Sequence, residues 1–266
     1  MQNFILRARR ALWTFKQPLT KTPKLLGVPV SDLFVWRNSD LWQTFFELTD
    51  MSGLFSDHEK ISERYATFYF FDNEGVLFFE KRLDLTCNKR QTIDLSLFLS
   101  NSKCTSGTFC VFHSHTPKVI SDVGSFIAER GYVGYRYNDA PLRAYVHGNL
   151  DAICLLPDMK RQLLGSSSFL AREYWLQHEL LDSAEYEIAM VNPSSRDQRI
   201  YCQLQSTRNG EKIETKAIKL RSGGSHIFPL KIRQSGTARI IIGSHLVMAR
   251  PLVYRFKNKR MDVFHG

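Results

Sequence analysis

The sequence predicts an all-β protein made of two tandem immunoglobulin-like β-sandwiches related by an internal repeat. Three observations lead to this fold class: an aromatic-rich composition, short strand-like runs separated by turn signals, and a polar signature that occurs twice. The chain has 266 residues, with 19 Phe, 10 Tyr and 4 Trp against 15 Gly, a composition that favours strands. The 43% hydrophobic and 23% charged residues are typical of a globular protein, which excludes global disorder, collagen and coiled coil.

The polar signature contains the same residue types in the same order in both halves of the chain. In the first copy it comprises Ser106-Gly107-Thr108, Ser114-His115, Arg130, Tyr135-Arg136-Tyr137, Asn138 and His147-Gly148. In the second copy it comprises Ser235-Gly236-Thr237, Ser244-His245, Arg250, Tyr254-Arg255-Phe256, Asn258 and His265-Gly266. Spacings differ by one residue at most points, but the stretch after Ser-His is longer in the first copy. An ordered match of this kind predicts two homologous domains.

The repeat divides the chain into four parts. Residues 1–31 form a basic N-terminal segment, 32–157 a first sandwich, 158–182 a helical linker, and 183–266 a second sandwich. In the N-terminal segment, apolar residues recur at helical spacing between Ile5 and Phe15, which predicts a short amphipathic helix. Three roles are open for it: residues 1–24 bind an anionic membrane surface, the helix packs on the body of the protein, or it is a disordered arm.

Seven strands are expected in each copy, because apolar runs alternate with turn signals about every ten residues. Those of the first copy are Trp42–Leu48, Tyr65–Phe71, Val76–Leu85, Gln91–Leu99, Thr108–His113, Tyr132–Tyr137 and Arg143–His147. Those of the second are Tyr186–Val191, Ile200–Ser206, Ile213–Leu220, His226–Pro229, Ala238–Gly243, Leu252–Phe256 and Met261–His265. Between the copies, Ser168–Leu181 predicts a helix with Ser166 or Ser167 as its N-cap.

The positive charge is concentrated at the two ends of the chain. Residues 1–31 carry six basic residues and no acid, whereas residues 183–266 carry 15 basic and 6 acidic residues, a net charge of +9. This asymmetry favours an acidic glycan, a phospholipid head group or another anionic partner, although a solvated basic face explains it equally well. Nucleic acid is not expected, because half of the aromatic and basic strand at Tyr254–Lys257 must face its own core.

The cysteines and the hydropathy indicate the compartment. The five cysteines are Cys87, Cys104, Cys110, Cys154 and Cys202. Their odd number and the absence of a C-x-x-C pair predict free, mostly buried thiols in a reducing compartment. No apolar run approaches the roughly 20 residues that span a bilayer. We therefore expect a cytoplasmic protein, with a peripheral position at the inner membrane face as an alternative.

The second copy resembles one family in its layout, the sensory-rhodopsin-transducer-like small β-sandwich proteins. The residues that carry the resemblance are Asn192 at a strand end, the ridge Lys219-Leu220-Arg221, the late Ser244 and Pro251 at a strand start. It covers roughly 80 residues. The resemblance implies a ligand-binding or adaptor module, with sugars among its ligands, and not an enzyme.

Strand counting places the repeated polar residues at one loop end of each sandwich, where such folds usually keep binding residues. The candidate ligand-binding residues are Ser114, His115, Arg130, His147 and Asn149 in the first copy, with Ser244, His245, Arg250 and His265 in the second. Arg pairs with carboxylates or phosphates, and His and Ser bind hydroxyls. A metal at His115 and His147 is an alternative that lacks a third ligand, and a purely structural role is another.

The function expected from these patterns is non-catalytic binding of a polar or acidic, glycan-related ligand, because the familiar catalytic motifs are absent. Two alternatives are kept: an enzyme of unrecognised class with a metal or His-based acid–base site in the first copy, and a membrane-surface adaptor. No cofactor is expected apart from that metal. The longer loop Thr116–Glu129 favours a specific small-ligand site in the first copy, while the charge of the second favours an extended anionic partner.

Overall fold

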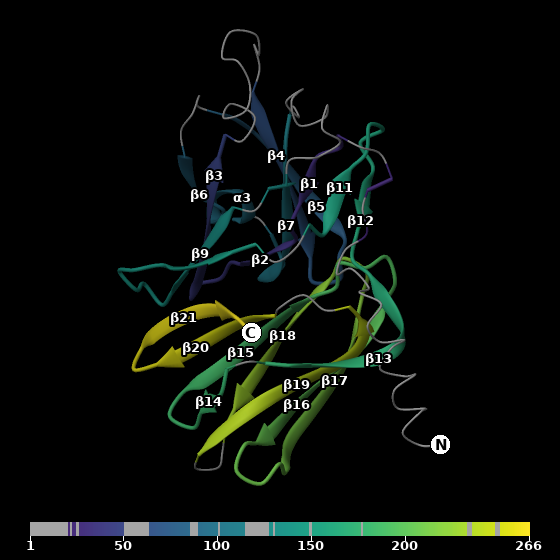
Figure 1. Cartoon of the computed structure of the whole chain (residues 1–266). Coiled ribbons are helices and arrows are strands. Elements are labelled where there is room, and N and C mark those ends of the chain that lie inside the picture. The colour runs from purple at the N-terminus through teal and green to yellow at the C-terminus, as the bar shows by residue number, and fades with distance from the viewer. Residues whose placement is uncertain are drawn as a thin grey trace.

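The computed structural model is all-β. It describes residues 21, 23–24, 27–50, 64–85, 90–100, 102–114, 128–129, 131–148, 151–176, 178–232, 236–247 and 251–266. In this part of the chain, 21 strands form five sheets, and the one helix is the single turn α3 (Ser96–Leu99). None of the described helices has the length and apolar character needed to cross a membrane. The two copies lie one above the other in Figure 1.

The first copy contains three sheets. The central sheet has the order β2-β7-β4-β5, with β2 (Phe34–Arg37), β7 (Ser106–His113), β4 (Tyr65–Asp72) and β5 (Leu77–Asp84). The flanking sheet has the order β10-β9-β3-β6, with β10 (Ala144–His147), β9 (Tyr132–Tyr137), β3 (Trp42–Thr49) and β6 (Arg90–Asp94). The accessory sheet has the order β12-β11-β1-β8, with β12 (Arg161–Leu163), β11 (Ile153–Leu155), β1 (Val30–Ser31) and β8 (Ala128–Glu129).

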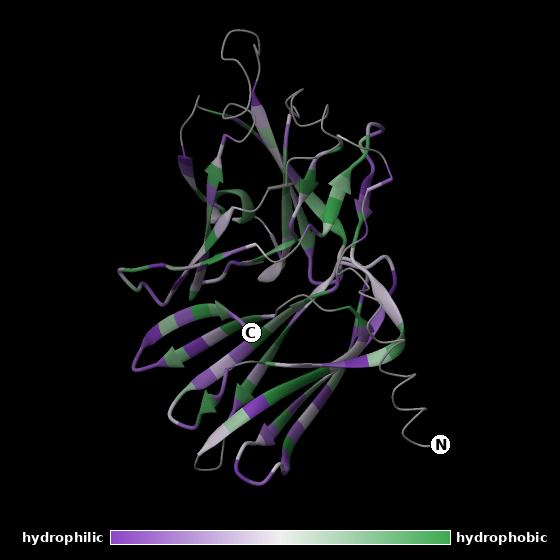
Figure 2. Cartoon of the chain, viewed as in Figure 1, coloured by the Kyte–Doolittle hydropathy of each residue, from purple (hydrophilic) through white to green (hydrophobic). Residues whose placement is uncertain are grey.

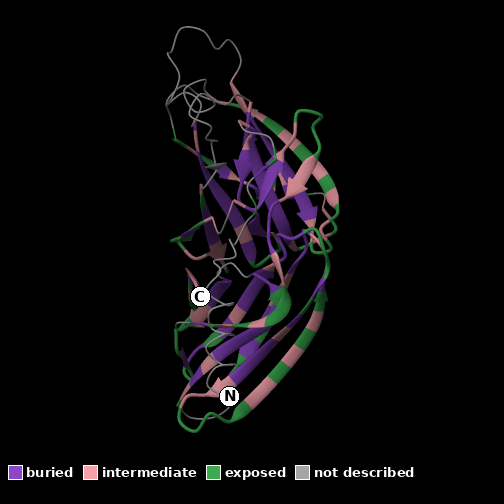
Figure 3. Ribbon diagram, turned by 45° about the vertical axis from the view of Figure 1, so that its right-hand side comes forward, coloured by how far each residue is buried: buried purple, intermediate pink, exposed green. Residues whose placement is uncertain are grey.

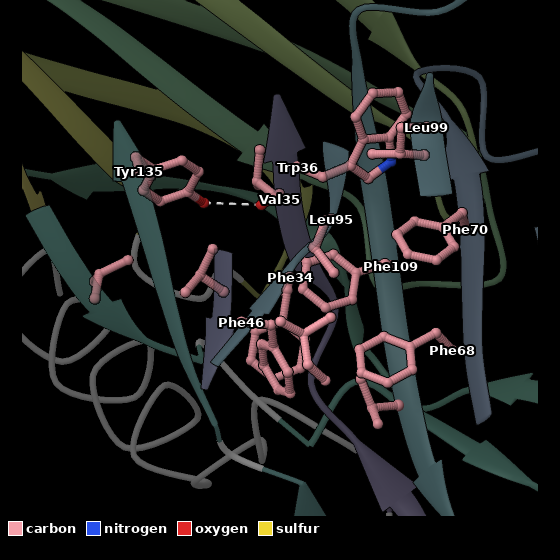
Figure 4. Close-up of a cluster of buried hydrophobic side chains, with 14 of the residues drawn as sticks. Phe34, Val35, Trp36, Phe46, Phe68, Phe70, Leu95, Leu99, Phe109 and Tyr135 are labelled. Atoms are coloured by element: carbon pink, nitrogen blue, oxygen red, sulfur yellow. Dashed lines mark hydrogen bonds between the residues drawn. The ribbon is translucent and has the colours of Figure 1, made fainter. Parts of the chain in front are cut away.

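The two inner strands of the central sheet, β4 and β7, are buried on both faces, and the sequence of β4 explains why. Successive side chains of a strand point to opposite faces. Phe68 and Phe70 therefore join the cluster shared with the flanking sheet, while Tyr69 and Phe71 join a second cluster that includes Ile153 of the accessory sheet. Figure 4 shows the first cluster. An apolar run without alternation is the expected pattern for a strand covered on both sides.

The second copy contains two sheets. The distal sheet has the order β13-β19-β16-β17, with β13 (Ser167–Trp175), β19 (Thr237–Leu246), β16 (Gln198–Ser206) and β17 (Lys212–Leu220), and β14 (Leu180–Leu181) also pairs with β19. The bridging sheet has the order β18-β15-β20-β21, with β18 (Ser225–Lys231), β15 (Glu185–Val191), β20 (Leu252–Lys257) and β21 (Arg260–His265). One cluster, with Ile188, Leu204 and Ile242 among its members, lies between these sheets. Hydrophilic and hydrophobic residues alternate along their strands (Figure 2).

The internal repeat is confirmed by the strand order. The eight main strands of the first copy are β2 to β7, β9 and β10, and those of the second copy are β13 and β15 to β21. In each copy we number these strands one to eight along the chain. Both copies then contain one sheet of order 1-6-3-4 and one of order 8-7-2-5. The two halves therefore share one strand topology, with the same non-consecutive neighbours in both sheets. The accessory sheet belongs to the first copy alone.

The two copies share a hydrophobic core. The outward face of the bridging sheet contributes Ala189, Leu252, Tyr254 and Val263 to the cluster of the first copy. There it covers the side on which the edge strands β2 and β10 of the first copy meet. Edge strands expose unpaired backbone groups and are commonly covered, and β2 is accordingly buried throughout. Figure 3 shows buried residues filling the interior of both copies.

The predicted helical linker is wrong. Ser168–Leu181 contains strands β13 and β14, and β13 is the first strand of the second copy. Its residues Arg172–Trp175 pair with β19, after a register shift that follows Ser167. Apolar residues at near-helical spacing also fit an edge strand with an irregularity, so periodicity alone does not separate the two. The predicted N-terminal helix lies outside the described residues.

The fourteen predicted strands all overlap observed strands. Their boundaries differ by at most three residues, with one exception. The expected strand Gln91–Leu99 stops at Asp94, because the carboxylate of Asp94 accepts hydrogen bonds from the backbone and hydroxyl of Ser96 at 3.0 and 2.6 Å and starts the turn of α3. Such local hydrogen bonds compete with a sheet ladder.

Candidate functional site

Ser114 lies at the end of β7 and faces away from the core shared with the flanking sheet. Its backbone N–H donates to the carbonyl of Tyr65 at 2.9 Å, and its Oγ accepts from the N–H of Tyr65 at 3.2 Å. Because residues alternate along a strand, Ser114 shares its face with Phe112 and not with Val111, which belongs to the core. Ser114 therefore opens toward the accessory sheet.

A cavity of about 410 Å³ lies on this side of the central sheet. One wall comes from the start of β4 and the end of β7, and the other from the approach to β1 and the turn between β11 and β12. The lining residues are Gly27, Val28, Pro29, Tyr65, Thr67, Phe112, His113, Ser114, Leu155, Leu156, Pro157 and Met159. An apolar lining with a few hydroxyl groups in this volume is typical of small-molecule sites.

Positive charge lies beside the aromatic residues of this face. The guanidinium carbon of Arg82 is 3.5 Å from the ring centroid of Tyr65, and that of Arg161 is 4.7 Å from the ring centroid of Tyr69. Both distances fall within the range of cation–π attraction. Tyr65 lines the cavity, so the Arg82 guanidinium places a positive charge next to it.

His113 is a buried residue at the same end of the central sheet. Its Nε2 is 2.9 Å from the carbonyl of Thr49, a geometry in which the ring N–H donates. Burial lowers the pKa of His113, although the Thr49 hydrogen bond and the charge of Asp50 oppose this. The imidazole is therefore held neutral near pH 7, where it donates to the backbone and carries no charge.

His147 and His265, the closing histidines of the two copies, contact each other. Their ring centroids are 4.7 Å apart, and Nε2 of His265 is 3.0 Å from the carbonyl of His147. Nδ1 of His147 is 2.8 Å from the carbonyl of Gly148. These two predicted ligand-binding residues therefore lie where the first copy meets the second.

Ser244 and His245 lie at the end of β19 in the distal sheet. Ser244 is buried and accepts from the N–H of Leu246 at 3.0 Å, whereas His245 is exposed, with its Nδ1 at 3.3 Å from the carbonyl of Ser168. His265 lies on β21, in the other sheet of the same copy. Of the nine predicted binding residues, five are described by the structure, and only Ser114 among these five lines the cavity.

Matched residues of the polar signature lie on opposite faces in the two copies. Ser114 faces away from its sandwich core, while Ser244 faces inward with Ile242. Tyr135 joins the core of its own copy, whereas Tyr254 turns away from Val253 and the core of its copy and packs on the first copy. A shift of one residue moves a side chain to the other face of a sheet, so the matched residues have different environments.

Four candidate residues, His115, Arg130, Asn149 and Arg250, lie outside the described residues, as does the loop Thr116–Glu129 for the most part. The metal site at His115 and His147 and the membrane contact of residues 1–24 therefore stay predictions. Within the described ranges, His, Cys, Asp and Glu form no group of three or more that could hold a metal ion.

The described cysteines are free thiols. Cys110, Cys154 and Cys202 are buried and Cys104 is half-buried. Burial raises the pKa of Cys110 far above its usual value and that of Cys202 to about 12. Such thiols stay protonated near pH 7 and are poor nucleophiles.

Sequence reasoning missed one wall of the cavity. Leu155 ends β11, and Leu156, Pro157 and Met159 form the β11–β12 turn, in a region assigned to the end of the first sandwich and the start of a linker. A signal was present, since Pro157-Asp158 between two apolar runs is typical of a turn between strands. Met159 has φ of 62° in that turn.

Comparisons with known proteins add no identification. No protein-family model matches the sequence, and no curated protein matches it. Among solved structures, infectious bursal disease virus of the Gx strain shows 10% identity over 84% of this chain and 53% of that chain, with a TM-score of 0.16. The Gt strain shows 10% identity over 89% and 55%, with a TM-score of 0.15. This chain thus spans about half the length of either match, and such TM-scores establish no shared fold.

Proposed function

We propose that this protein is a non-catalytic binding protein that takes a small acidic or polyhydroxylated, glycan-related ligand in the cavity beside Ser114. The observation that carries the proposal is the cavity itself, which combines an apolar wall with the side chains of Ser114, Thr67 and Tyr65. Sugars have apolar C–H faces and many hydroxyls, so they fit sites that offer aromatic surface and hydrogen-bonding groups together.

The acidic character of the ligand follows from Arg82. Its guanidinium lies over the Tyr65 ring, and its separation from the carboxylate of Asp84 is 3.8 Å, a loose and exposed pair. A carboxylate bound in the cavity would gain from the nearby positive charge, because electrostatic interactions strengthen where water is partly excluded. We therefore expect a sugar acid to bind more tightly than its neutral counterpart.

The fold proposed for this function is a pair of tandem sandwiches of the immunoglobulin-like class. Two antiparallel sheets with one core between them support it in each copy, although the order 1-6-3-4 and 8-7-2-5 is not that of an immunoglobulin domain. Five sheets would also suit a five-bladed propeller. Propeller blades are built from consecutive strands, whereas β9 pairs with β3 and β19 with β13.

Two further parts of the proposal rest on composition. The +9 charge of residues 183–266 supports capture of an extended anionic partner by the second copy. Free, buried thiols support a reducing, cytoplasmic location. The layout shared with the sensory-rhodopsin-transducer-like proteins supports a ligand-binding or adaptor role for that copy.

Calorimetric titration with glucuronic acid, galacturonic acid, sialic acid and glucose tests the proposal. We expect one site per chain, with at least one of the acids binding more tightly than glucose. A Ser114→Phe variant, which fills the cavity, should lose the heat of binding. Thr215→Phe is the matched control, because Thr215 is exposed on β17 of the second copy, and it should bind as the wild type does. No heat from any sugar at millimolar concentration, or equal binding by Ser114→Phe, would refute the cavity as the site.

A further inference from the structure

The outer face of the flanking sheet carries aromatic and basic side chains. Phe46 of β3 belongs to the core, so its neighbours Phe45 and Glu47 lie on the outer face. In the pairing register, Phe45 lies opposite Gly134 of β9, and Gly134 lies opposite Tyr145 of β10. The face is turned away from the accessory sheet, which lies on the other side of the first copy (Figure 1). One row of the face therefore crosses three adjacent strands.

The ring of Tyr145 lies across this row. A Cβ on Gly134 would be 2.6 Å from Cε1 of Tyr145 and 3.0 Å from its Cδ1 and Cζ, so the ring occupies the space above the glycine. The Tyr145 hydroxyl donates to Oε1 of Glu47 at 3.1 Å, which fixes the direction of the ring. Tyr145 is nevertheless 41% exposed. An aromatic ring that is fixed on a sheet and open to solvent offers a surface on which a second ring can stack.

Two arginines lie beside this ring, and both pack on Phe45. The guanidinium carbon of Arg143 is 3.6 Å from the ring centroid of Phe45, and that of Arg136 is 5.7 Å from it. Arg143 immediately precedes β10, and its Nη1 donates to the Tyr145 hydroxyl at 3.4 Å. Phe45 is only 3% exposed, because long charged side chains of this kind cover apolar surface.

Neither arginine has an acidic partner in the part of the chain that the structure describes. The ion pairs among those residues include neither Arg136 nor Arg143. Arg136 donates to the side-chain oxygen of Gln43, and Arg143 donates to Tyr145. Two positive charges that lie side by side without a counter-ion repel each other and attract an anion.

The face continues along the strands to a second tyrosine and a third arginine. Tyr132, two residues before Gly134 on β9, is 49% exposed and lies one row, or roughly 7 Å of strand, from the row of Tyr145. The guanidinium carbon of Arg90 is 5.8 Å from the ring centroid of Tyr132, and its Nε donates to Glu47 at 2.9 Å. We define the arginine–tyrosine face as Arg90, Tyr132, Arg136, Arg143 and Tyr145.

The polar groups of this face discriminate between anionic ligands. A guanidinium only donates hydrogen bonds. The carboxylate of Glu47 already accepts from Arg90 and Tyr145, and the side-chain oxygen of Gln43 accepts from Arg136. A sugar needs acceptors for its hydroxyl protons, and here these acceptors are occupied. A phosphodiester needs donors only, and the bases attached to it stack on aromatic rings.

We propose that the arginine–tyrosine face binds single-stranded nucleic acid. The bases stack on Tyr145 and Tyr132, and a phosphate lies between Arg136 and Arg143. Aromatic stacking combined with basic contacts to the backbone is the general mode in which proteins bind single strands without reading their sequence.

This face is distinct from the surfaces considered above. The expectation against nucleic acid rests on Tyr254–Lys257 of the second copy, whereas the arginine–tyrosine face belongs to the first copy. The cavity beside Ser114 lies between the central and accessory sheets, on the other side of the core. Binding of a strand to the face is therefore independent of the proposed function.

Fluorescence anisotropy of the full chain with a labelled oligothymidylate of about 12 nucleotides tests the proposal. Tyr145→Ala should weaken binding by about tenfold or more, because a stacked base loses its ring. Tyr145→Phe keeps the ring and should bind nearly as the wild type does. Tyr201→Ala is the matched control, because the ring of Tyr201 also lies over a glycine, Gly243, but donates to Glu173 on the distal sheet. It should bind as the wild type does.

The salt dependence of the same binding measures the phosphate contact. For single strands, each lost phosphate contact lowers the slope of log K against log salt by about 0.7. Arg136→Gln/Arg143→Gln should therefore reduce the slope by at least about 0.7. Lys160→Gln removes an exposed charge on the accessory-sheet side of the first copy, and it should leave the slope unchanged.

Four results would overturn the proposal. The first is no anisotropy change at micromolar protein. The second is equal affinity of the wild type and Tyr145→Ala, which would place the strand elsewhere on the chain. The third is a hyaluronate oligosaccharide that displaces the labelled strand as well as the unlabelled strand does, since the face would then bind acidic sugars. The fourth is thymidine monophosphate that binds as tightly as the strand, because a free nucleotide cannot use both tyrosines.

Discussion

The guanidinium of Arg37, on β2, forms an ion pair with the carboxylate of Glu187, on β15, and so joins the two copies. The guanidinium carbon also lies 3.5 Å from the ring centroid of Trp42 and 5.0 Å from that of Tyr254. The side chains of Arg37 and Glu187 are 11% and 26% exposed. A guanidinium that lies beside two aromatic rings and has little exposure to water is stable in its charged form only if its carboxylate partner is present.

Removal of one member of this pair should therefore destabilise the protein strongly. We expect Glu187→Gln to lower the free energy of unfolding by about 3 kcal/mol, because it leaves the Arg37 charge buried without its carboxylate. The double variant Arg37→Met/Glu187→Leu should recover most of this loss. Urea denaturation measures both. Asp158→Asn, which breaks the exposed pair with Lys160, is the control and should change nothing measurable. Equal, small effects of Glu187→Gln and Asp158→Asn would contradict the role of the pair.

Gly75 marks a second contact between the copies. It has φ of +79°, and a Cβ there would lie 2.3 Å from the carbonyl oxygen of Ser222. Gly75→Ala should lower the free energy of unfolding by clearly more than about 1 kcal/mol, since it adds a clash to the backbone strain. Gly210→Ala is the matched control, with φ of +73° and open space apart from Gln205 Nε2 at 3.8 Å. If the two variants lose the same stability, the contact with Ser222 is unimportant.

Tyr135 donates its hydroxyl to the buried carbonyl of Val35 at 2.8 Å, as Figure 4 shows. Tyr135→Phe should cost about 1–2 kcal/mol in thermal or urea unfolding, because that carbonyl loses its hydrogen bond away from water. Tyr137→Phe, two residues further on the same strand at a half-buried position, should cost close to nothing. A Tyr135→Phe variant as stable as Tyr137→Phe would show that the hydrogen bond does not contribute.

His113 should make stability depend on pH. Burial holds its folded-state pKa below the usual value of about 6.5, so the unfolded chain binds the proton more readily. The contribution of neutral His113 to the free energy of unfolding is complete above about pH 6.5 and is lost as the pH falls through the folded-state pKa. His113→Gln keeps a donor for the Thr49 carbonyl but does not titrate. The variant should lose less stability than the wild type between about pH 7.5 and about pH 5.5 in urea denaturation. His245→Gln, at an exposed residue, is the control, and a wild-type pH profile for His113→Gln would contradict the prediction.

Strand positions could be predicted because aromatic runs and turn signals are local, and Tyr132–Tyr137 was placed without error. The face of the sheet on which each side chain lies could not be predicted from the sequence, because it depends on the register of the strands. The Ser-His match pairs Ser114 with Ser244, yet the two lie on opposite faces of their sheets. The cavity has Ser114 and the stretch Leu155–Met159 in its lining, and these are distant in sequence, so no local pattern brings them together. β13 was mistaken for a helix because its irregularity at Phe169 and Leu170 disrupts strand alternation.

Hydrogen–deuterium exchange of the full chain with and without saturating glucuronic acid tests the binding proposal most directly, because it locates the ligand. If the ligand occupies the cavity, amides of residues 64–67, 111–114 and 154–160 should exchange more slowly, while β16 and β17 stay unchanged. Slower exchange confined to the second copy, or no change in these three segments, would contradict the account.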